Sequence, residues 1–358
     1  MARQRGVTLK QIAERAGCSV TAVSKTLNGA RGTAAVSEET QKRVWAIARE
    51  MGYTPNYMAR ALQSGRTNCI GLISHIENEA DHGGHYWSRI FMGVQAHLRD
   101  ANQDLVVVGS DHAQDELHRG IGHLLQRRVD ALIVPVTMYQ PWLPELEAID
   151  APIVYTDSLL VSRHPGVTSD MVPGLRQALS HLAELGHRHI VWVPLTLHGA
   201  VDDLPRSEAL MAESRALGLE VTTWPVATDK LSEPGAMAEA IESAREQIAA
   251  RLAGGMPGTA MVIYSERAAL GADAALQGAG LSIPGDVSVI SFDDFYAEFA
   301  VPPMTVVTGN LTQVGARSAA LALALAEGTL TPEDAAGRVE RPASELIVRK
   351  STGPARPR

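Results

Sequence analysis

The chain has 358 residues, of which 45% are hydrophobic and 20% charged, a composition typical of a globular protein with two or three domains. It contains no run of about 18 apolar residues, and its first residues, MARQRGVTLK, have no apolar leader, so the composition favours a cytoplasmic protein and excludes a membrane-spanning one. The net charge of −8 is unevenly spread: residues 1–66 hold 11 Lys and Arg against 4 Asp and Glu, a net charge of +7, which leaves −15 for the remainder. A basic head on an acidic body favours a phosphate-binding module whose body avoids non-specific contact with DNA.

The two cysteines, Cys18 and Cys69, fall in different predicted modules. We therefore expect no disulfide and a reducing compartment.

Residues 7–28, VTLKQIAERAGCSVTAVSKTLN, predict two short helices joined by a tight turn. Thr8 is placed to cap the first helix, Gly17 can adopt the backbone angles of the turn, and Ser19 is placed to cap the second helix. Apolar residues recur at helical spacing on the inner faces of both helices: Leu9, Ile12, Ala13, Ala16, Val23 and Leu27.

The outward face of the second helix carries small and basic side chains, Val20, Thr21, Ser24 and Lys25. A short helix of this kind after a glycine turn is the helix-turn-helix pattern, whose second helix enters the major groove of DNA. The alternative is an ordinary helical hairpin on a protein surface. Ser37 is placed to cap a third helix over 38–51, which completes a small head.

A short connector follows the head. Pro55 favours an extended residue before it, and Asn56 is placed to cap a helix of about two turns over 56–63. Isolated helices of this length are marginal in water. We therefore expect this helix to form only against a partner or DNA, which would make it a switch; the alternative is a plain interdomain linker.

From Cys69 onwards, strand-like and helix-like segments alternate. Strands are expected at 70–74, 104–110, 130–136 and 152–157, and again at 189–194, 219–226, 260–265 and 287–294. Helices are expected at 88–101, 115–128, 142–149, 173–186, 206–217, 234–253, 267–279 and 311–327. Apolar strands alternating with helices predict parallel sheets covered on both faces.

The predicted fold class is therefore an N-terminal all-α helix-turn-helix head followed by an α/β body of two similar lobes with parallel sheets. Because ligands bind at the carboxyl ends of such strands, two lobes facing each other there would enclose a cleft. The expected boundaries are 1–55 for the head, 56–67 for the connector, 68–345 for the body and 346–358 for a disordered tail. Within the body, the N-lobe is expected at about 68–165 and 300–328, and the C-lobe at about 166–299 and 329–345.

Longer stretches of the sequence match a known pattern in order and spacing. The head reads VTLKQIAERAGCSVTAVSKTLNG, the connector reads GYTPNYMARAL, and HLAELGHRHI (181–190) and RAALGADAALQGAGLSIPGDVSVISFDD (267–294) follow in the body. Over nearly the whole chain, the sequence resembles the lactose-repressor (LacI/GalR) family of bacterial transcription regulators. The resemblance implies a body like periplasmic sugar-binding proteins, a homodimer on pseudo-palindromic operator DNA, and a small-molecule effector, usually a sugar or related metabolite, between the lobes. We expect no cofactor and no metal.

The resemblance also implies how the head contacts DNA. Val20, Thr21 and Lys25 would project to base edges, where Lys25 can donate to guanine and Val20 can contact a thymine methyl group. Contacts to phosphates are implied for Thr8, Ser19, Ser24, Asn28, Ser37 and Thr40.

In the connector, Leu62 matches the family's leucine that wedges between base steps in the minor groove. Asn56, Ala59 and Arg60 match the neighbouring positions that face the groove and the phosphates. The alternative for Leu62 is a buried linker leucine.

For the effector, the best matches are Arg206, whose guanidinium can bind paired hydroxyls or a carboxylate, and Asp293, whose carboxylate can accept from two hydroxyls. Weaker candidates are His75, Tyr86, Trp87, Asp157, Tyr264 and Ser265, each with packing or capping as the alternative. Ser265 and Glu266 stand where the family commonly has Asn and Asp, so the effector site departs from the usual sugar site. His82 and His85 lie close in sequence, but no further metal ligand accompanies them.

The leading hypothesis is thus a ligand-controlled, dimeric DNA-binding repressor. The alternative is a cytoplasmic solute-binding or sensor protein that does not bind an operator directly. An enzyme is disfavoured, because the sequence has no P-loop, no G-x-S-x-G elbow and no run of metal ligands.

Overall fold

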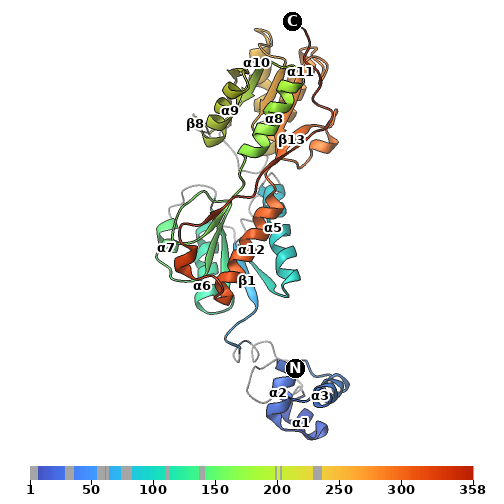
Figure 1. The fold of residues 1–358 in the computed structure, drawn as a ribbon, viewed down its shortest axis with the longest axis vertical. Helices are drawn as coiled ribbons and strands as arrows, with labels where there is room; N and C mark the ends of the chain where they lie inside the picture. The colour runs from blue at the N-terminus through green and yellow to red at the C-terminus, as the bar shows by residue number, and fades with distance from the viewer. Residues whose placement is uncertain are drawn as a thin grey trace.

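The structure is a computed structural model. It describes residues 7–28, 36–54, 61, 64–73, 83–109, 113–136, 142–197, 200–201, 204–228 and 236–357. Figure 1 shows a small helical head, which contains α1, α2 and α3, and two α/β lobes that follow along the long axis of the molecule. Among the described residues, no helix combines the length and apolar composition needed to cross a membrane.

The head consists of α1 (Leu9–Ala16), α2 (Val20–Asn28) and α3 (Glu38–Glu50), as the sequence predicted. Thr8 caps α1 in a reciprocal capping box with Gln11, and Gly17 ends α1 in the left-handed conformation at φ 62°. Ser37 caps α3 by accepting from the Thr40 amide. The helices bury a compact apolar cluster formed by Ile12, Ala13, Ala16, Val23, Leu27, Val44 and Ala48.

The N-lobe is built on a six-stranded parallel sheet with the order β14-β5-β4-β3-β1-β2. Its strands are β1 (Cys69–Ile73), β2 (Asp104–Val108), β3 (Ala131–Pro135), β4 (Ile153–Thr156), β5 (Gly166–Val167) and β14 (Val339–Glu340). Its helices are α5 (Gly83–Asp100), α6 (Ala113–Leu125), α7 (Leu143–Glu147), α12 (Leu311–Glu327) and α13 (Pro332–Ala335). The apolar runs of β1 and β3 are buried along their whole length, because helices cover both faces of the sheet.

Helices α5 and α12 pack side by side at unusually close range (Figure 1). A glycine on each helix faces the backbone of the other: a Cβ added at Gly315 would lie 1.9 Å from the Ile90 carbonyl oxygen, and one added at Gly93 would lie 2.0 Å from that of Thr312. Only glycine allows this approach, so the pair forms one rigid unit on the face of the sheet.

The C-lobe repeats this plan with the strand order β15-β13-β12-β11-β6-β9, in which only β15 is antiparallel. Its strands are β6 (His189–Val193), β9 (Glu220–Thr223), β11 (Ala260–Ile263), β12 (Ser288–Phe292), β13 (Thr305–Thr308) and β15 (Glu345–Ile347). Its helices are α8 (Val172–Glu184), α9 (Leu204–Ala216), α10 (Ala236–Leu252), α11 (Glu266–Gly278) and the short 3-10 helix η2 (Ala297–Phe299). A small separate sheet has the order β10-β7-β8 and consists of β7 (Leu195–Leu197), β8 (Ala200–Val201) and β10 (Val226–Thr228).

The chain passes between the lobes three times, near residues 168–171, 308–310 and 341–344. The crossing segments are tied together: Ser169 donates to the Gly309 carbonyl, and Asn310 donates to the Ala343 carbonyl at 2.7 Å. The predicted lobe boundaries are therefore wrong at three points.

Strand β13 belongs to the C-lobe sheet, whereas β5 and β14 belong to the N-lobe sheet, opposite to the predicted assignment in each case. The reason is that β5 and β14 have two residues each, too few for an apolar pattern. In addition, β13 pairs with β12 of the C-lobe, although the chain passes directly from it into α12 of the N-lobe.

The predicted disorder of the tail from residue 346 is also wrong for residues 346–357. Ser351 is buried, accepts from the Thr305 amide at 2.8 Å and donates to the Val289 carbonyl at 2.6 Å. Further along, the Ala355 amide donates to the Leu185 carbonyl at 2.8 Å. The tail follows the C-lobe because its backbone hydrogen bonds are satisfied there.

Candidate DNA-binding face and interlobe site

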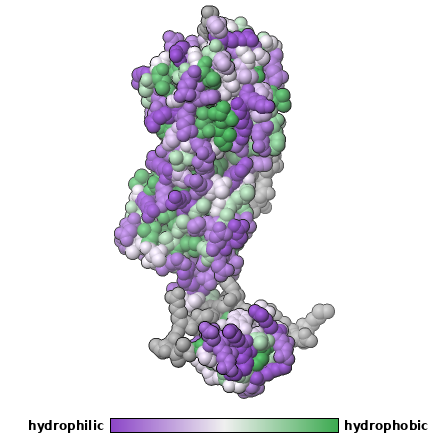
Figure 2. Space-filling view, turned by 45° about the vertical axis from the view of Figure 1, so that its right-hand side comes forward, coloured by the Kyte–Doolittle hydropathy of each residue, from purple (hydrophilic) through white to green (hydrophobic). Residues whose placement is uncertain are grey.

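Helix α2 presents the residues that the sequence predicted to read DNA bases. Val20 is 45% exposed, Thr21 is exposed, and Lys25 is half-buried in the last turn. Val23 and Leu27 are buried against α1 and α3, which fixes the rotation of α2 about its axis. On the face drawn in Figure 2, the head surface is largely hydrophilic.

Three of the predicted phosphate contacts lie at helix starts. Thr8 and Ser37 are the capping residues of α1 and α3, and the Ser19 hydroxyl accepts from the Ala22 amide at 3.1 Å. Helix starts carry outward-pointing amides and partial positive charge, which suits a phosphate. Ser24 and Thr40 are half-buried on α2 and α3, and Asn28 is the last residue of α2.

Five predicted site residues lie outside the described residues. They are the connector residues Asn56, Ala59, Arg60 and Leu62 and the effector candidate His75.

The predicted effector residues gather where the strands of both sheets end. Asp157 directly follows β4, Tyr264 and Ser265 follow β11, and Asp293 follows β12. Asp157 and Asp293 both have left-handed backbones, with φ of 57° and 76°. Such a turn at the end of a strand is uncommon for a residue other than glycine, and it occurs here at matching positions in the two lobes.

In the C-lobe, Arg206 lies beside two aromatic rings and acts electrostatically on Asp293. The Arg206 guanidinium lies 4.6 Å from the Tyr264 ring centre and 4.5 Å from that of Phe292, and it donates to the Tyr264 carbonyl at 3.3 Å. Burial raises the pKa of Asp293, while the positive charges of Arg206 and Arg267 oppose that rise. The two rings restrict the positions that the guanidinium can take.

In the N-lobe, Tyr86 and Asp157 form the facing half of the site. The Tyr86 hydroxyl donates to Asp157 Oδ1 at 2.9 Å, and the Thr168 hydroxyl donates to the same oxygen at 3.5 Å. Burial raises the pKa of Tyr86 well above its ordinary value; Asp157 and Asp293 raise it further, and Arg206 opposes the rise. Asp293 and Arg206 belong to the other lobe, and the contact of the Tyr86 ring with that of Phe295, two residues after Asp293, brings the two lobes together at this point.

Trp87 lies beside this cluster, with its ring edge-on to Tyr86 at 5.5 Å between centroids. Burial is also the main cause that raises the pKa of Asp157, and Arg206 opposes it. The N-lobe candidates Tyr86, Trp87 and Asp157 are thus brought together.

Ser265 caps a helix, which was the alternative to its predicted contact with the effector. It is buried and caps α11 by accepting from the Ala268 amide at 3.4 Å. Its neighbour Glu266, which was not a candidate, accepts from the amides of Phe295 at 3.0 Å and Tyr296 at 2.6 Å. Burial raises the pKa of Glu266 to about 7, against the effect of those two N–H groups. No sequence motif marks this role, because it depends on a loop about 30 residues away.

The loop held by Glu266 touches the other lobe. The Tyr296 hydroxyl is hydrogen-bonded to the His85 ring, and the Phe295 ring lies 6.4 Å from that of Tyr86. Asp294 in the same loop is fixed by an ion pair with Arg349 at 2.8 Å. The C-lobe therefore contacts the first turns of α5 directly beside the predicted effector site. Among the described residues, no cluster of three or more metal-ligating side chains occurs.

A helix-turn-helix head joined to a two-lobe α/β body with polar residues at the facing strand ends defines a ligand-responsive DNA-binding protein. Residues 8–56 match the bacterial regulatory proteins of the lacI family, and residues 179–352 match the periplasmic binding protein-like domain. The chain thus combines the helix-turn-helix domain of the lacI family with a periplasmic binding protein-like domain, the domain pair of transcriptional regulators that are not enzymes.

Similar proteins agree with this assignment. The HTH-type transcriptional repressor PurR of Actinobacillus pleuropneumoniae serotype 3 (strain JL03) is 28% identical over 315 residues, which cover 87% of this chain and 88% of that protein. The crystal structure of the lac repressor dimer bound to operator and the anti-inducer ONPF matches the fold with a TM-score of 0.73 at 24% identity, over 98% of this chain and 100% of that one. The complex of the transcriptional regulator CelR with cellobiose matches with a TM-score of 0.62 at 25% identity, over 96% of this chain and 99% of that one.

Proposed function

We propose that this regulator is a homodimeric repressor that binds a pseudo-palindromic operator through its head. Its operator affinity is controlled by a small molecule, a sugar or related metabolite, bound between the two lobes. The observation that supports this proposal is that Tyr86 is hydrogen-bonded to Asp157 in one lobe and lies against Phe295 of the other lobe, two residues after Asp293. A ligand that bridges these groups binds both lobes and so favours one relative arrangement of them. We place this activity in the cytoplasm, where chromosomal DNA is accessible.

On the DNA side, α2 would lie in the major groove of each half-site. Val20 would contact a thymine methyl group, Thr21 a base edge, and Lys25 the acceptors of guanine. The helix starts capped by Thr8 and Ser37 would contact phosphates, together with Ser19, Ser24, Asn28 and Thr40.

The connector would complete the DNA contact. Leu62 would wedge between base steps in the minor groove, with Asn56, Ala59 and Arg60 beside it. Because such a helix is marginal alone, its folding can depend on the spacing of the two N-lobes that follow the two connectors in the dimer.

On the ligand side, the paired groups suit a compound rich in hydroxyls. The carboxylates of Asp157 and Asp293 accept hydrogen bonds, the Arg206 guanidinium donates them, and Trp87 and Tyr86 offer apolar ring surface. The similarity to the CelR–cellobiose complex supports a sugar.

The ligand side is tested by thermal-shift screening of the full chain against sugars, sugar phosphates and nucleobases. We expect at least one compound to raise the melting temperature of the wild type and not of Asp293→Asn, with operator affinity retained in the variant. The control is Glu220→Gln, because Glu220 begins β9 and so lies at the opposite, amino edge of the sheet, with its side chain 81% exposed. Retained ligand binding in Asp293→Asn would show that the site is elsewhere.

The DNA side is tested by selecting duplexes from a random pool with the purified protein. We expect a two-fold symmetric sequence, bound with an affinity that falls steeply with salt because phosphate contacts release counterions. Deletion of residues 1–66 should abolish this binding. If the selection yields no symmetric sequence, or if the deletion leaves binding unchanged, the alternative of a sensor without direct operator binding would be favoured instead.

A further inference from the structure

The last residues of the connector enter the body through a short, highly bonded turn. The Gly65 amide donates to the Ala61 carbonyl at 2.9 Å, as in a helical turn. The Ser64 hydroxyl accepts from the Arg66 amide at 3.2 Å and donates to the Arg66 carbonyl at 2.9 Å. The chain direction between the end of the connector and β1 is therefore fixed locally by Ser64.

Asp130, in the loop before β3, holds the next two residues. Its Oδ1 accepts from the amide and the hydroxyl of Thr67 at 2.8 and 3.0 Å, and its Oδ2 accepts from the Asn68 amide at 2.8 Å. The Asp130 side chain is only 9% exposed. A buried carboxylate with three donors is a firm attachment, so Thr67 and Asn68 move with the N-lobe.

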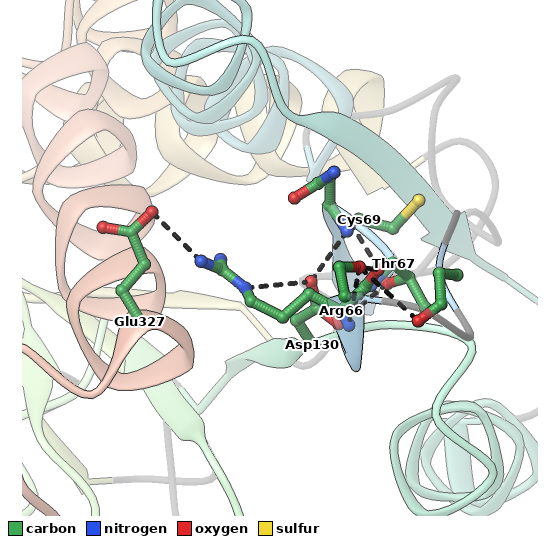
Figure 3. A network of polar contacts seen from close by, with 8 residues as sticks. Arg66, Thr67, Cys69, Asp130 and Glu327 are labelled. Carbon is green, nitrogen blue, oxygen red and sulfur yellow. Dashed lines mark hydrogen bonds and ion pairs between the residues drawn. The ribbon is translucent and has the colours of Figure 1, made fainter. Parts of the chain in front are cut away.

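Arg66 connects this attachment to a distant helix, as Figure 3 shows. Its Nε lies 3.7 Å from Asp130 Oδ2, and its Nη1 lies 3.3 Å from Oε1 of Glu327, the last residue of α12. The guanidinium thus sits between two carboxylates, and its side chain is 30% exposed. We call Asp130, Arg66 and Glu327 the connector junction.

Helix α12 spans the N-lobe from the interlobe crossings to the connector junction. It starts at Leu311, directly after the crossing segment Gly309–Asn310, and its 17 residues extend over roughly 25 Å. The close packing of Gly315 against α5 joins it to the helix that carries Tyr86 of the proposed effector site. A shift of this helix pair therefore displaces Glu327 with it, because close-packed helices move as units.

We infer that Arg66 and Glu327 are positioning residues for operator binding: through the connector junction, they set how the connector leaves the N-lobe and tie that direction to α12. This inference rests on the proposed function and adds to it a specific route from the lobes to the DNA-facing segment. The opposing possibility is that Arg66 contacts a DNA phosphate directly. The two carboxylates beside the guanidinium favour the positioning role, because they neutralise it and hold it against the lobe.

The test compares Glu327→Gln, Arg66→Gln and Arg66→Lys with the control Glu333→Gln. Glu333 is exposed on the neighbouring helix α13. Each full-length variant is measured for affinity to the duplex selected by the wild type and to a random-sequence duplex, over a series of salt concentrations. If Arg66→Gln does not fold, Glu327→Gln still tests the inference, because it leaves the hydrogen bonds of Asp130 to Thr67 and Asn68 intact.

We expect Glu327→Gln and Arg66→Gln to weaken binding to the selected duplex by roughly 1.5- to 5-fold for each connector junction, which is the range for partly exposed ion pairs. A dimer contains two such junctions, so its affinity should fall by the square of that factor. Arg66→Lys should lie closer to the wild type. Affinity for the random duplex and the salt dependence should not change, since the basic head is intact.

Two results would overturn the inference. One is that Glu327→Gln binds the selected duplex as tightly as Glu333→Gln does. The other is that Arg66→Gln weakens binding to both duplexes alike with a shallower salt dependence, which identifies a phosphate contact. A wild type without any duplex preference would instead refute the proposed function itself.

Discussion

Replacing Gly315 by alanine tests the closest helix contact in the body. The new Cβ would lie 1.9 Å from the Ile90 carbonyl oxygen, whereas real Cβ atoms essentially never come within 3.0 Å, so α5 and α12 must move apart by about 1 Å. A gap of that size removes a quarter to a half of the dispersion energy between the facing atoms. Ile90, Val94 and Val314 are fully buried in the same cluster. With about 2 kcal/mol for each buried side chain, the expected loss is roughly 1.5–3 kcal/mol.

The matched control is Gly122→Ala, in α6 of the same lobe. A Cβ at Gly122 would have only Gln126 Nε2 as a neighbour, at 4.0 Å. Alanine should stabilise that helix by up to about 1 kcal/mol, because glycine is the poorer helix former. Urea unfolding followed by circular dichroism should therefore separate the two variants by roughly 2–4 kcal/mol. Equal stability of Gly315→Ala and Gly122→Ala would refute the rigid α5–α12 contact.

Three further predictions follow from the head and the interlobe loop. Burial, assisted by Asp293 and Asp294, raises the pKa of Glu266 from 4.5 to about 7. The contribution of Glu266 to stability is therefore complete below pH 4.5 and is lost as the pH rises through 7. Glu266→Gln should flatten the fall in unfolding free energy between about pH 5 and pH 8, and an unchanged slope would contradict this assignment. Thr8→Ala should speed amide hydrogen exchange in α1 by an amount equivalent to about 1 kcal/mol, whereas Thr8→Ser should not. Val20→Ala should weaken the preference for one base pair of each half-site by roughly 1 kcal/mol of binding free energy, without changing the salt dependence of binding. A uniform loss of affinity, whichever base pair is changed, would argue against base contact.

Local patterns were sufficient to predict the head and the order of elements in the body. Thr8, Gly17 and Ser37 have the predicted capping and turn roles, because caps depend on residues within four positions along the chain. The apolar runs of the central strands were equally clear. Helix α5, in contrast, starts at Gly83 rather than near 88, since its first turn carries glycines that do not indicate a helix.

Features that depend on distant contacts were not predictable. The pairing of β14 with β5 and the ordered tail depend on partners far away in sequence, which a local pattern does not identify. The same holds for Glu266 and for the connector junction, whose Arg66–Glu327 pair joins residues 261 positions apart. The predicted effector residues lie at strand ends (Asp157, Asp293) or in the first turns of helices (Tyr86, Trp87, Arg206), which share the carboxyl edge of a parallel sheet, and their role in binding stays a proposal.

The three crossings between the lobes have a consequence for synthesis on the ribosome. The head is contiguous and can fold as soon as it emerges. The N-lobe lacks α12 and β14, and the C-lobe lacks β13 and β15, until residues 305–347 have been made. A chain terminated before residue 311 would carry a complete DNA-reading head on two lobes with open sheet edges and uncovered apolar faces. Such a product would be prone to aggregation and degradation, so quality control would remove a head that no longer has a sensor attached.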